Sequence, residues 1–78
     1  MTGRFANIIV DISHEKLDRP FQYLIPPQLQ NVLEVGMSVM IPFGRGNKLI
    51  KGYVMELTDQ AEYDVSRLKA VDSIVEGG

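Results

Sequence analysis

Residues 39–46 read VMIPFGRG, an apolar segment that meets a proline and then breaks at a glycine-rich, basic turn. Alternation places four apolar side chains on one face, as in a half-buried β-strand: Met37, Val39, Ile41 and Phe43. Pro42 cannot donate a ladder hydrogen bond, so we expect it at a sheet edge or near a strand end. Gly44 and Gly46 supply backbone freedom, including positive φ, and leave main-chain N–H groups uncovered. We therefore expect that a ligand can approach the backbone closely at this turn.

The same period of two extends outward from this strand, 37–43. It predicts further strands, the last of them less regular, at 5–12, 21–25, 49–57 and 68–75. Residues 28–35 carry apolar side chains at helical spacing before Gly36, enough for one or two helical turns, and 58–66 is an acidic, polar loop with room for another turn. Gly52 predicts a bulge or a close backbone contact. The expected fold is mainly β, a small twisted antiparallel sheet or partial barrel with one short helical turn.

Length and composition indicate one small globular domain. The chain has 78 residues, 45% of them hydrophobic and 23% charged, and it contains no cysteine. No apolar run approaches the roughly 20 residues that span a bilayer, and the N-terminus lacks the pattern of a secretory signal, so we expect a cytoplasmic protein without membrane association. The net charge of −2 argues against general attraction to a nucleic-acid backbone. Any contact with nucleic acid must therefore be local.

Signals of catalysis and metal binding are missing from the sequence. His14 is the only histidine, it has no cysteine partner, and a solvated loop residue is the simpler interpretation. There is no GxxxxGK[ST] phosphate loop. We therefore predict no catalytic residue, no metal ligand and no cofactor in these 78 residues.

A possible binding site remains on the segment 21–25. Phe21 and Tyr23 share one strand face, where they could stack on unpaired bases, belong to the core, or do both by lining a shallow pocket. Gln22 points the other way and could read a base edge, although an exposed strand glutamine is usually only solvated. A basic patch around the predicted hairpin is either a solubilising face or a phosphate site: Arg45, Lys48 and Lys51.

Four sequence motifs follow one another in a fixed order and spacing that covers nearly all of residues 5–75. They are FQYLIP at 21–26, GMSVMIPFGR at 36–45, GYV at 52–54 and LKAV at 68–71. Together they resemble the N-terminus of the primosomal protein N prime family, the PriA replication-restart DNA helicases. The resemblance implies a 3′ DNA-binding domain that captures the 3′-hydroxyl end of the nascent leading strand at stalled or abandoned forks and helps primosome assembly.

The resemblance also implies the site. In the family, the terminal nucleotide lies in a pocket whose residues correspond here to Phe21, Gln22, Tyr23, Gly44 and Lys69. The chemistry fits, because rings can hold a base, bare backbone can lie beside the sugar, and a cation can meet the last phosphate. One position departs from the family, which often has aspartate where this chain has Gln22. Aspartate only accepts hydrogen bonds, whereas glutamine both donates and accepts, so selectivity at this position is expected to differ.

For the rest of the protein, the resemblance implies an ATP-dependent 3′ to 5′ DNA helicase that uses ATP with magnesium and binds zinc in another domain. Residues 1–78 would then be a single 3′ DNA-binding domain, truncated at its C-terminal end, with the helicase domains outside this chain. The implied partners are forked DNA with a 3′ end and, through the parent protein, single-stranded DNA-binding protein and helicase-loading primosome proteins. The alternative is a protein-interaction module that docks another helicase domain or a restart partner.

Overall fold

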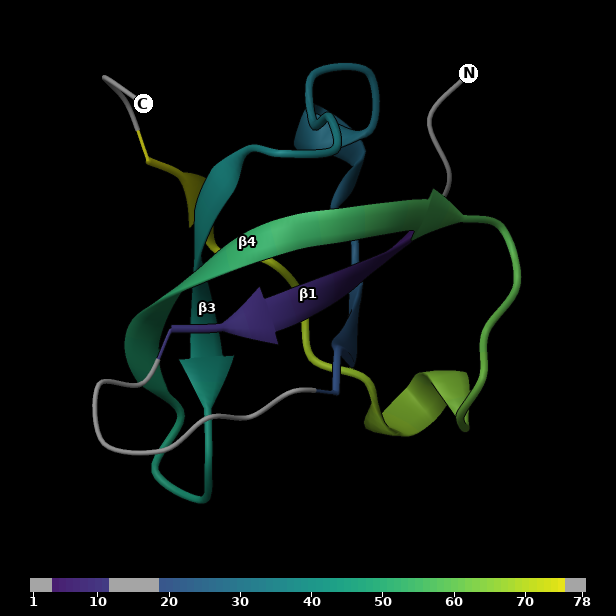
Figure 1. Ribbon diagram of the computed structural model, residues 1–78. Coiled ribbons are helices and arrows are strands. Elements are labelled where there is room, and N and C mark those ends of the chain that lie inside the picture. The colour runs from purple at the N-terminus through teal and green to yellow at the C-terminus, as the bar shows by residue number, and fades with distance from the viewer. Residues whose placement is uncertain (1–3, 12–18, 76–78) are drawn as a thin grey trace.

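A computed structural model describes residues 4–11 and 19–75 (Figure 1). Five strands and two short 3₁₀ turns follow one another along the chain: β1 (Phe5–Val10), β2 (Phe21–Leu24), η1 (Pro27–Leu29), β3 (Ser38–Phe43), β4 (Lys48–Thr58), η2 (Val65–Arg67) and β5 (Ser73–Ile74). The predicted end of the first strand at Ile12, and His14, lie outside the described residues. The structure confirms the mainly β fold class.

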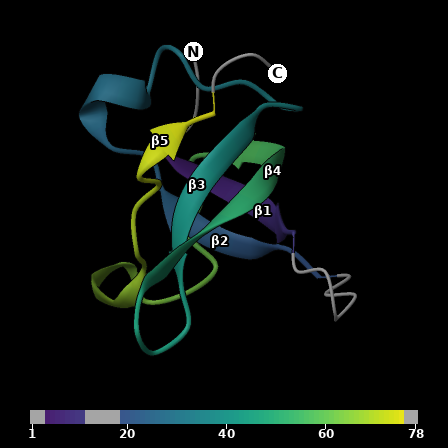
Figure 2. The ribbon, with the colours of Figure 1, turned by 90° about the vertical axis from the view of Figure 1, so that its left-hand side faces the viewer.

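The strands form one antiparallel sheet in the order β2-β1-β4-β3-β5. The segment after η2 curls this sheet, because it contacts strands that are not neighbours in that order. Its backbone bridges Leu24 of β2 through Ala70, and Ile74 of β5 then pairs with Val39 of β3. In two perpendicular views, η2 and the turn between β3 and β4 lie at the same end of the molecule (Figures 1 and 2).

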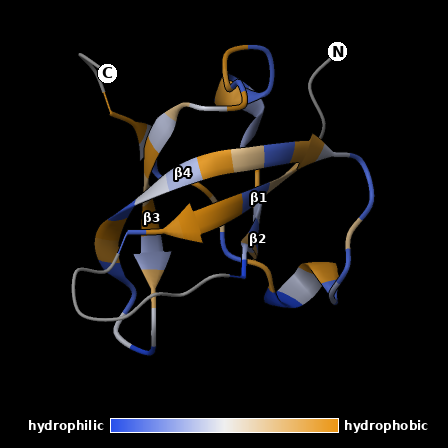
Figure 3. Ribbon diagram, viewed as in Figure 1, coloured by the Kyte–Doolittle hydropathy of each residue, from blue (hydrophilic) through white to orange (hydrophobic). Residues whose placement is uncertain are grey.

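The alternation around 37–43 is confirmed by burial. Val39 and Ile41 are fully buried, and Met37 and Phe43 pack against the same core. In Figure 3 the arrowhead end of β1 is coloured hydrophobic, whereas the turn between β3 and β4 shows no hydrophobic colour. Pro42 lies near the end of β3, where it pairs with Leu49 only, since β5 reaches no further than Met40. The expectation that Pro42 sits near a strand end is therefore also confirmed.

The two glycine predictions have different outcomes. Gly44 has φ +75°, but the second left-handed residue of the turn is Asn47, with φ 52°, and not Gly46 as expected. At Gly52 the predicted close contact is confirmed, because a Cβ there would lie 2.5 Å from Ile8 Cγ2 and 3.1 Å from the Ile9 carbonyl oxygen. The register shift of this strand pair falls elsewhere, between Asn7 and Ile8 on β1.

Two predicted elements are shorter in the structure. The helical turns expected at 28–35 reduce to η1, after which the chain turns and buries Leu33 while Val32 stays half exposed. So short a segment gains too few helical hydrogen bonds to offset the cost of nucleation. The strand expected at 68–75 reduces to β5, because the chain passes there from β2 to β3 and cannot run as one straight strand.

Two kinds of feature are absent from residues 4–11 and 19–75. Within these ranges no helix is long and apolar enough to cross a membrane. The same described residues contain no group of three or more His, Cys, Asp or Glu side chains that could hold a metal ion.

Candidate functional site

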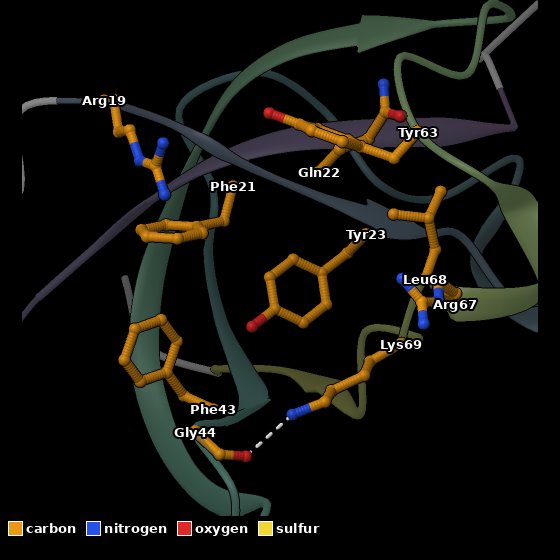
Figure 4. Close-up of a pocket in the computed structure, with 10 residues that line it drawn as sticks. All are labelled: Arg19, Phe21, Gln22, Tyr23, Phe43, Gly44, Tyr63, Arg67, Leu68 and Lys69. Atoms are coloured by element: carbon orange, nitrogen blue, oxygen red, sulfur yellow. Dashed lines mark hydrogen bonds between the residues drawn. The ribbon is translucent and has the colours of Figure 1, made fainter.

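A cavity of about 490 Å³ opens between β2, the end of β3 and η2 (Figure 4). This volume falls within the range of about 300–1,000 Å³ that is typical of small-ligand sites. All five residues that the resemblance implies line it: Phe21, Gln22, Tyr23, Gly44 and Lys69. The structure therefore brings together side chains that are up to 48 positions apart in the sequence.

One side of the cavity, here called the strand wall, consists of Phe21 and Tyr23 from β2 and Phe43 from β3. Tyr23 is 4% exposed, and its hydroxyl donates a 2.7 Å hydrogen bond to the carbonyl oxygen of Pro42. Burial raises the pKa of this phenol from its usual 10.0 to about 12, because the charged form would be desolvated. Tyr23 therefore belongs to the core and also lines the pocket. The sequence left both of these interpretations open.

Phe21 is half-buried and held from two directions. Its ring meets that of Phe43 edge to face, with centroids 5.2 Å apart and an interplanar angle of 85°. The Arg19 guanidinium carbon lies over the Phe21 ring, 5.1 Å from its centroid. Edge-to-face aromatic pairs and cation–π contacts are both attractive, so the ring is fixed in the wall of the cavity.

Gln22 is buried, and the expectation of a solvated strand glutamine is wrong. Its side chain is 6% exposed. Its amide nitrogen donates to the Gln60 carbonyl oxygen at 3.1 Å, and its amide oxygen accepts from the Glu62 N–H at 2.8 Å. The chain after β4 is thereby fastened to the edge of β2, where it borders the cavity.

The opposite side, here called the loop wall, consists of Tyr63, Arg67, Leu68 and Lys69. Asp64 caps η2 in this segment by accepting hydrogen bonds from the Ser66 hydroxyl and N–H, which hold the pKa of its carboxyl below the usual value. After η2, the Lys69 carbonyl oxygen accepts from the Leu24 N–H at 2.8 Å, so the loop wall is tied to β2 at this end as well.

Lys69 and Gly44 meet at one end of the cavity. The Lys69 ammonium donates a 2.8 Å hydrogen bond to the Gly44 carbonyl oxygen, as the dashed line in Figure 4 shows. Both residues are exposed, and a Cβ at Gly44 would meet nothing within 4 Å. The bare backbone and the cation are therefore side by side and accessible, as the sequence predicts for a ligand site at this turn.

Sequence reasoning missed five lining residues: Arg19, Phe43, Tyr63, Arg67 and Leu68. Phe43 had a usable signal, since it alternates with Ile41, whereas the other four follow no period. The basic patch of Arg45, Lys48 and Lys51 is exposed but does not line the cavity. The lining nevertheless contains three cationic side chains and no carboxylate, although the chain as a whole carries a net charge of −2. Such a cavity favours an anionic ligand.

Comparison with known proteins leads to the same family as the sequence motifs. Residues 7–77 match the PriA family described as the 3′DNA-binding domain (3′BD). The chain is also 35% identical over 72 residues to the replication restart protein PriA of Bacillus subtilis (strain 168), an alignment that covers 92% of this chain and 9% of that protein. The chain thus spans about a tenth of the length of this relative. It belongs to the PriA 3′DNA-binding domain family.

Proposed function

We propose that the cavity binds the 3′-terminal nucleotide of a DNA strand at a replication fork, as the membership of the 3′DNA-binding domain family implies. The observation that supports this role is the convergence of the five implied residues on one cavity that is lined by cations and by no carboxylate. The strand wall would contact the base, the exposed backbone at Gly44 would lie beside the sugar, and the Lys69 ammonium would meet the last phosphate.

Selectivity for a strand end would come from shape. A terminal nucleotide fits a small cavity, whereas a strand that continues past its 3′ oxygen would have to pass through the wall. A 3′-phosphate adds both bulk and negative charge at this point. An oligonucleotide that ends in a 3′-hydroxyl should therefore bind more tightly than the same sequence ending in a 3′-phosphate.

Fluorescence anisotropy with these two oligonucleotides tests the proposal. A 5′-labelled strand of about ten nucleotides keeps the dye far from the 3′ end, and a strand whose 3′ end is buried in a hairpin provides a second competitor. Tighter binding of the free 3′-hydroxyl supports the proposed role. Equal affinity for all three strands would contradict it.

Residues outside the cavity extend the proposal to the rest of the strand. Arg45 lies in the turn that contains Gly44, Lys48 begins β4 and Lys51 follows on the same strand, so they could contact phosphates upstream of the terminal nucleotide. For the longer protein, we propose ATP-dependent DNA unwinding with magnesium and a zinc site in another domain. Its proposed partners are single-stranded DNA-binding protein and primosome loading proteins, and its proposed location is the cytoplasm.

One observation favours the alternative role as a protein-interaction module. Three side chains that alternate along β4 are exposed although they are apolar or aromatic: Leu49, Tyr53 and Met55. Exposed apolar side chains of this kind mark interaction surfaces when they are contiguous. An NMR titration with short single-stranded DNA separates the two roles, because strand-end binding should shift the amide signals of Phe21, Gly44 and Lys69.

A further inference from the structure

Tyr63 is the most exposed aromatic side chain of the cavity. Its exposed fraction is 56%, against 4% for Tyr23, while Phe21 and Phe43 are half-buried. In Figure 4 the Tyr63 ring lies on the side of the cavity away from the Lys69 and Gly44 contact. A nucleotide whose phosphate meets Lys69 would therefore extend its base toward Tyr63.

The rings of the strand wall have less surface to offer. Tyr23 is almost fully buried, and its hydroxyl is bonded to the Pro42 carbonyl oxygen. One face of Phe21 lies under the Arg19 guanidinium, and its ring also makes the edge-to-face contact with Phe43. These rings form the floor of the cavity, whereas Tyr63 still has an uncovered ring surface on which a base can stack.

The position of Tyr63 depends on Gln22. The two hydrogen bonds of the Gln22 side-chain amide hold the backbone at Gln60 and Glu62, immediately before Tyr63. The reverse amide orientation would place donor against donor and acceptor against acceptor, and a carboxylate could accept from Glu62 but could not donate to Gln60. A glutamine at this position is therefore suited to hold the segment at both points.

We propose that Tyr63 stacks on the base of the 3′-terminal nucleotide, and that Gln22 is the positioning residue that holds Tyr63 at the cavity; this rests on the proposed function. Both ends of the Gln22 amide are bonded to backbone, so the proposal gives Gln22 a positioning role and leaves recognition of the base to stacking. Stacking tolerates every base because each presents a flat π face. The four possible terminal bases should accordingly bind with affinities within about threefold of one another, the small spread reflecting stacking strength.

Replacing Tyr63 tests the stacking role directly. Tyr63→Ala should weaken binding of a 3′-hydroxyl oligonucleotide about tenfold, and Tyr63→Phe, which keeps the ring, should stay within about twofold of the wild type. Tyr53→Ala is the matched control, since Tyr53 is also exposed but lies on β4 outside the cavity. A 2-aminopurine at the 3′ terminus should lose fluorescence on binding the wild type and Tyr63→Phe, and should lose less on binding Tyr63→Ala.

A double-mutant cycle tests the positioning role. Gln22→Met removes both hydrogen bonds of the side-chain amide but keeps the length of the side chain. In this background Tyr63→Ala should weaken binding less than about threefold, because the ring is no longer held at the cavity. Circular dichroism establishes that each variant folds. Where Gln22→Met does not fold, Gln22→Asn replaces it, since the shorter amide cannot span both backbone partners.

The outcomes separate this inference from the proposed function. If the wild type prefers the 3′-hydroxyl end but Tyr63→Ala binds as well as Tyr53→Ala, the proposed function stands and the stacking role is wrong. If Tyr63→Ala weakens binding equally with and without Gln22, stacking stands and the positioning role is wrong. A strong preference for one terminal base would show that residue 22 or another group reads the base. If the wild type does not distinguish the strand ends, the proposed function fails, and this inference fails with it.

Discussion

The two walls of the cavity differ in what holds them in place. Tyr23 of the strand wall belongs to the hydrophobic core, and Phe21 and Phe43 pack against it. The loop wall is mostly exposed, and it is attached through individual hydrogen bonds, at Gln22 before Tyr63 and at Leu24 and Gly44 through Lys69. Substitutions in the strand wall should therefore change the free energy of unfolding, whereas those in the loop wall should change mainly the affinity for a ligand.

The largest effect is expected from Tyr23→Ala. Removing a buried aromatic side chain typically costs about 3–5 kcal/mol of unfolding free energy, and a domain of this size has only a small margin. Urea unfolding followed by circular dichroism measures the loss. Tyr63→Ala is the comparison in the other wall, and as an exposed residue it should change the unfolding free energy by less than about 0.5 kcal/mol. Equal losses in the two variants would refute the contrast between the walls.

Lys69→Ala should have the next largest effect, mainly on affinity, since its hydrogen bond to the Gly44 carbonyl oxygen is exposed. A hydrogen bond to a charged group contributes roughly 1.5–3 kcal/mol, so loss of one phosphate contact should weaken binding of a 3′-hydroxyl strand about tenfold or more. The slope of log K against log salt should also fall by about 0.7, the value for one phosphate of a single strand. Anisotropy titrations at several salt concentrations give both quantities.

Arg4→Ala provides the control for Lys69→Ala. It removes the same formal charge from an exposed residue that does not line the cavity. Its affinity and its salt slope should remain close to those of the wild type. If both variants weaken binding to the same extent, the interaction depends on total charge and not on an ammonium at the cavity.

Most of the strand wall could be predicted from the sequence. The period of two in 21–25 and 37–43 places Phe21 with Tyr23 and Phe43 with Ile41, and burial of one face of each strand fixes which way these rings point. The pattern does not show that the two faces meet at one cavity. That meeting requires the sheet order and the curl made by residues 69–75, which depend on pairings between distant segments.

The loop wall could not be predicted from the sequence pattern in this way. Tyr63 follows no period, and its place depends on hydrogen bonds that join Gln22 to residues 38 and 40 positions away. Lys69 was found only because its block resembles the family, since an isolated lysine after a polar loop has no local signal. The error at Gln22 has the same cause: alternation predicts an outward side chain, but only the fold shows that another segment covers it.

Of the two substitutions in the strand wall, Tyr23→Phe should have the smaller effect at neutral pH. The change keeps the ring but removes the donor to Pro42, and a typical loss is about 1 kcal/mol of unfolding free energy. Affinity for the strand end should not change, because the hydroxyl faces the protein backbone.

Alkaline pH should reduce the difference in stability between the wild type and Tyr23→Phe. Below the unfolded pKa of 10.0 the phenol is neutral in both states, and its contribution to stability is fully present. As the pH rises from 10.0 to about 12, the unfolded chain releases this proton before the folded protein does, so the unfolding free energy of the wild type should fall. Tyr23→Phe lacks this proton, and the advantage of the wild type should shrink across that interval. Parallel curves for the two proteins would mean that Tyr23 is not buried as a neutral phenol, and the strand wall would then be as open to solvent as the loop wall.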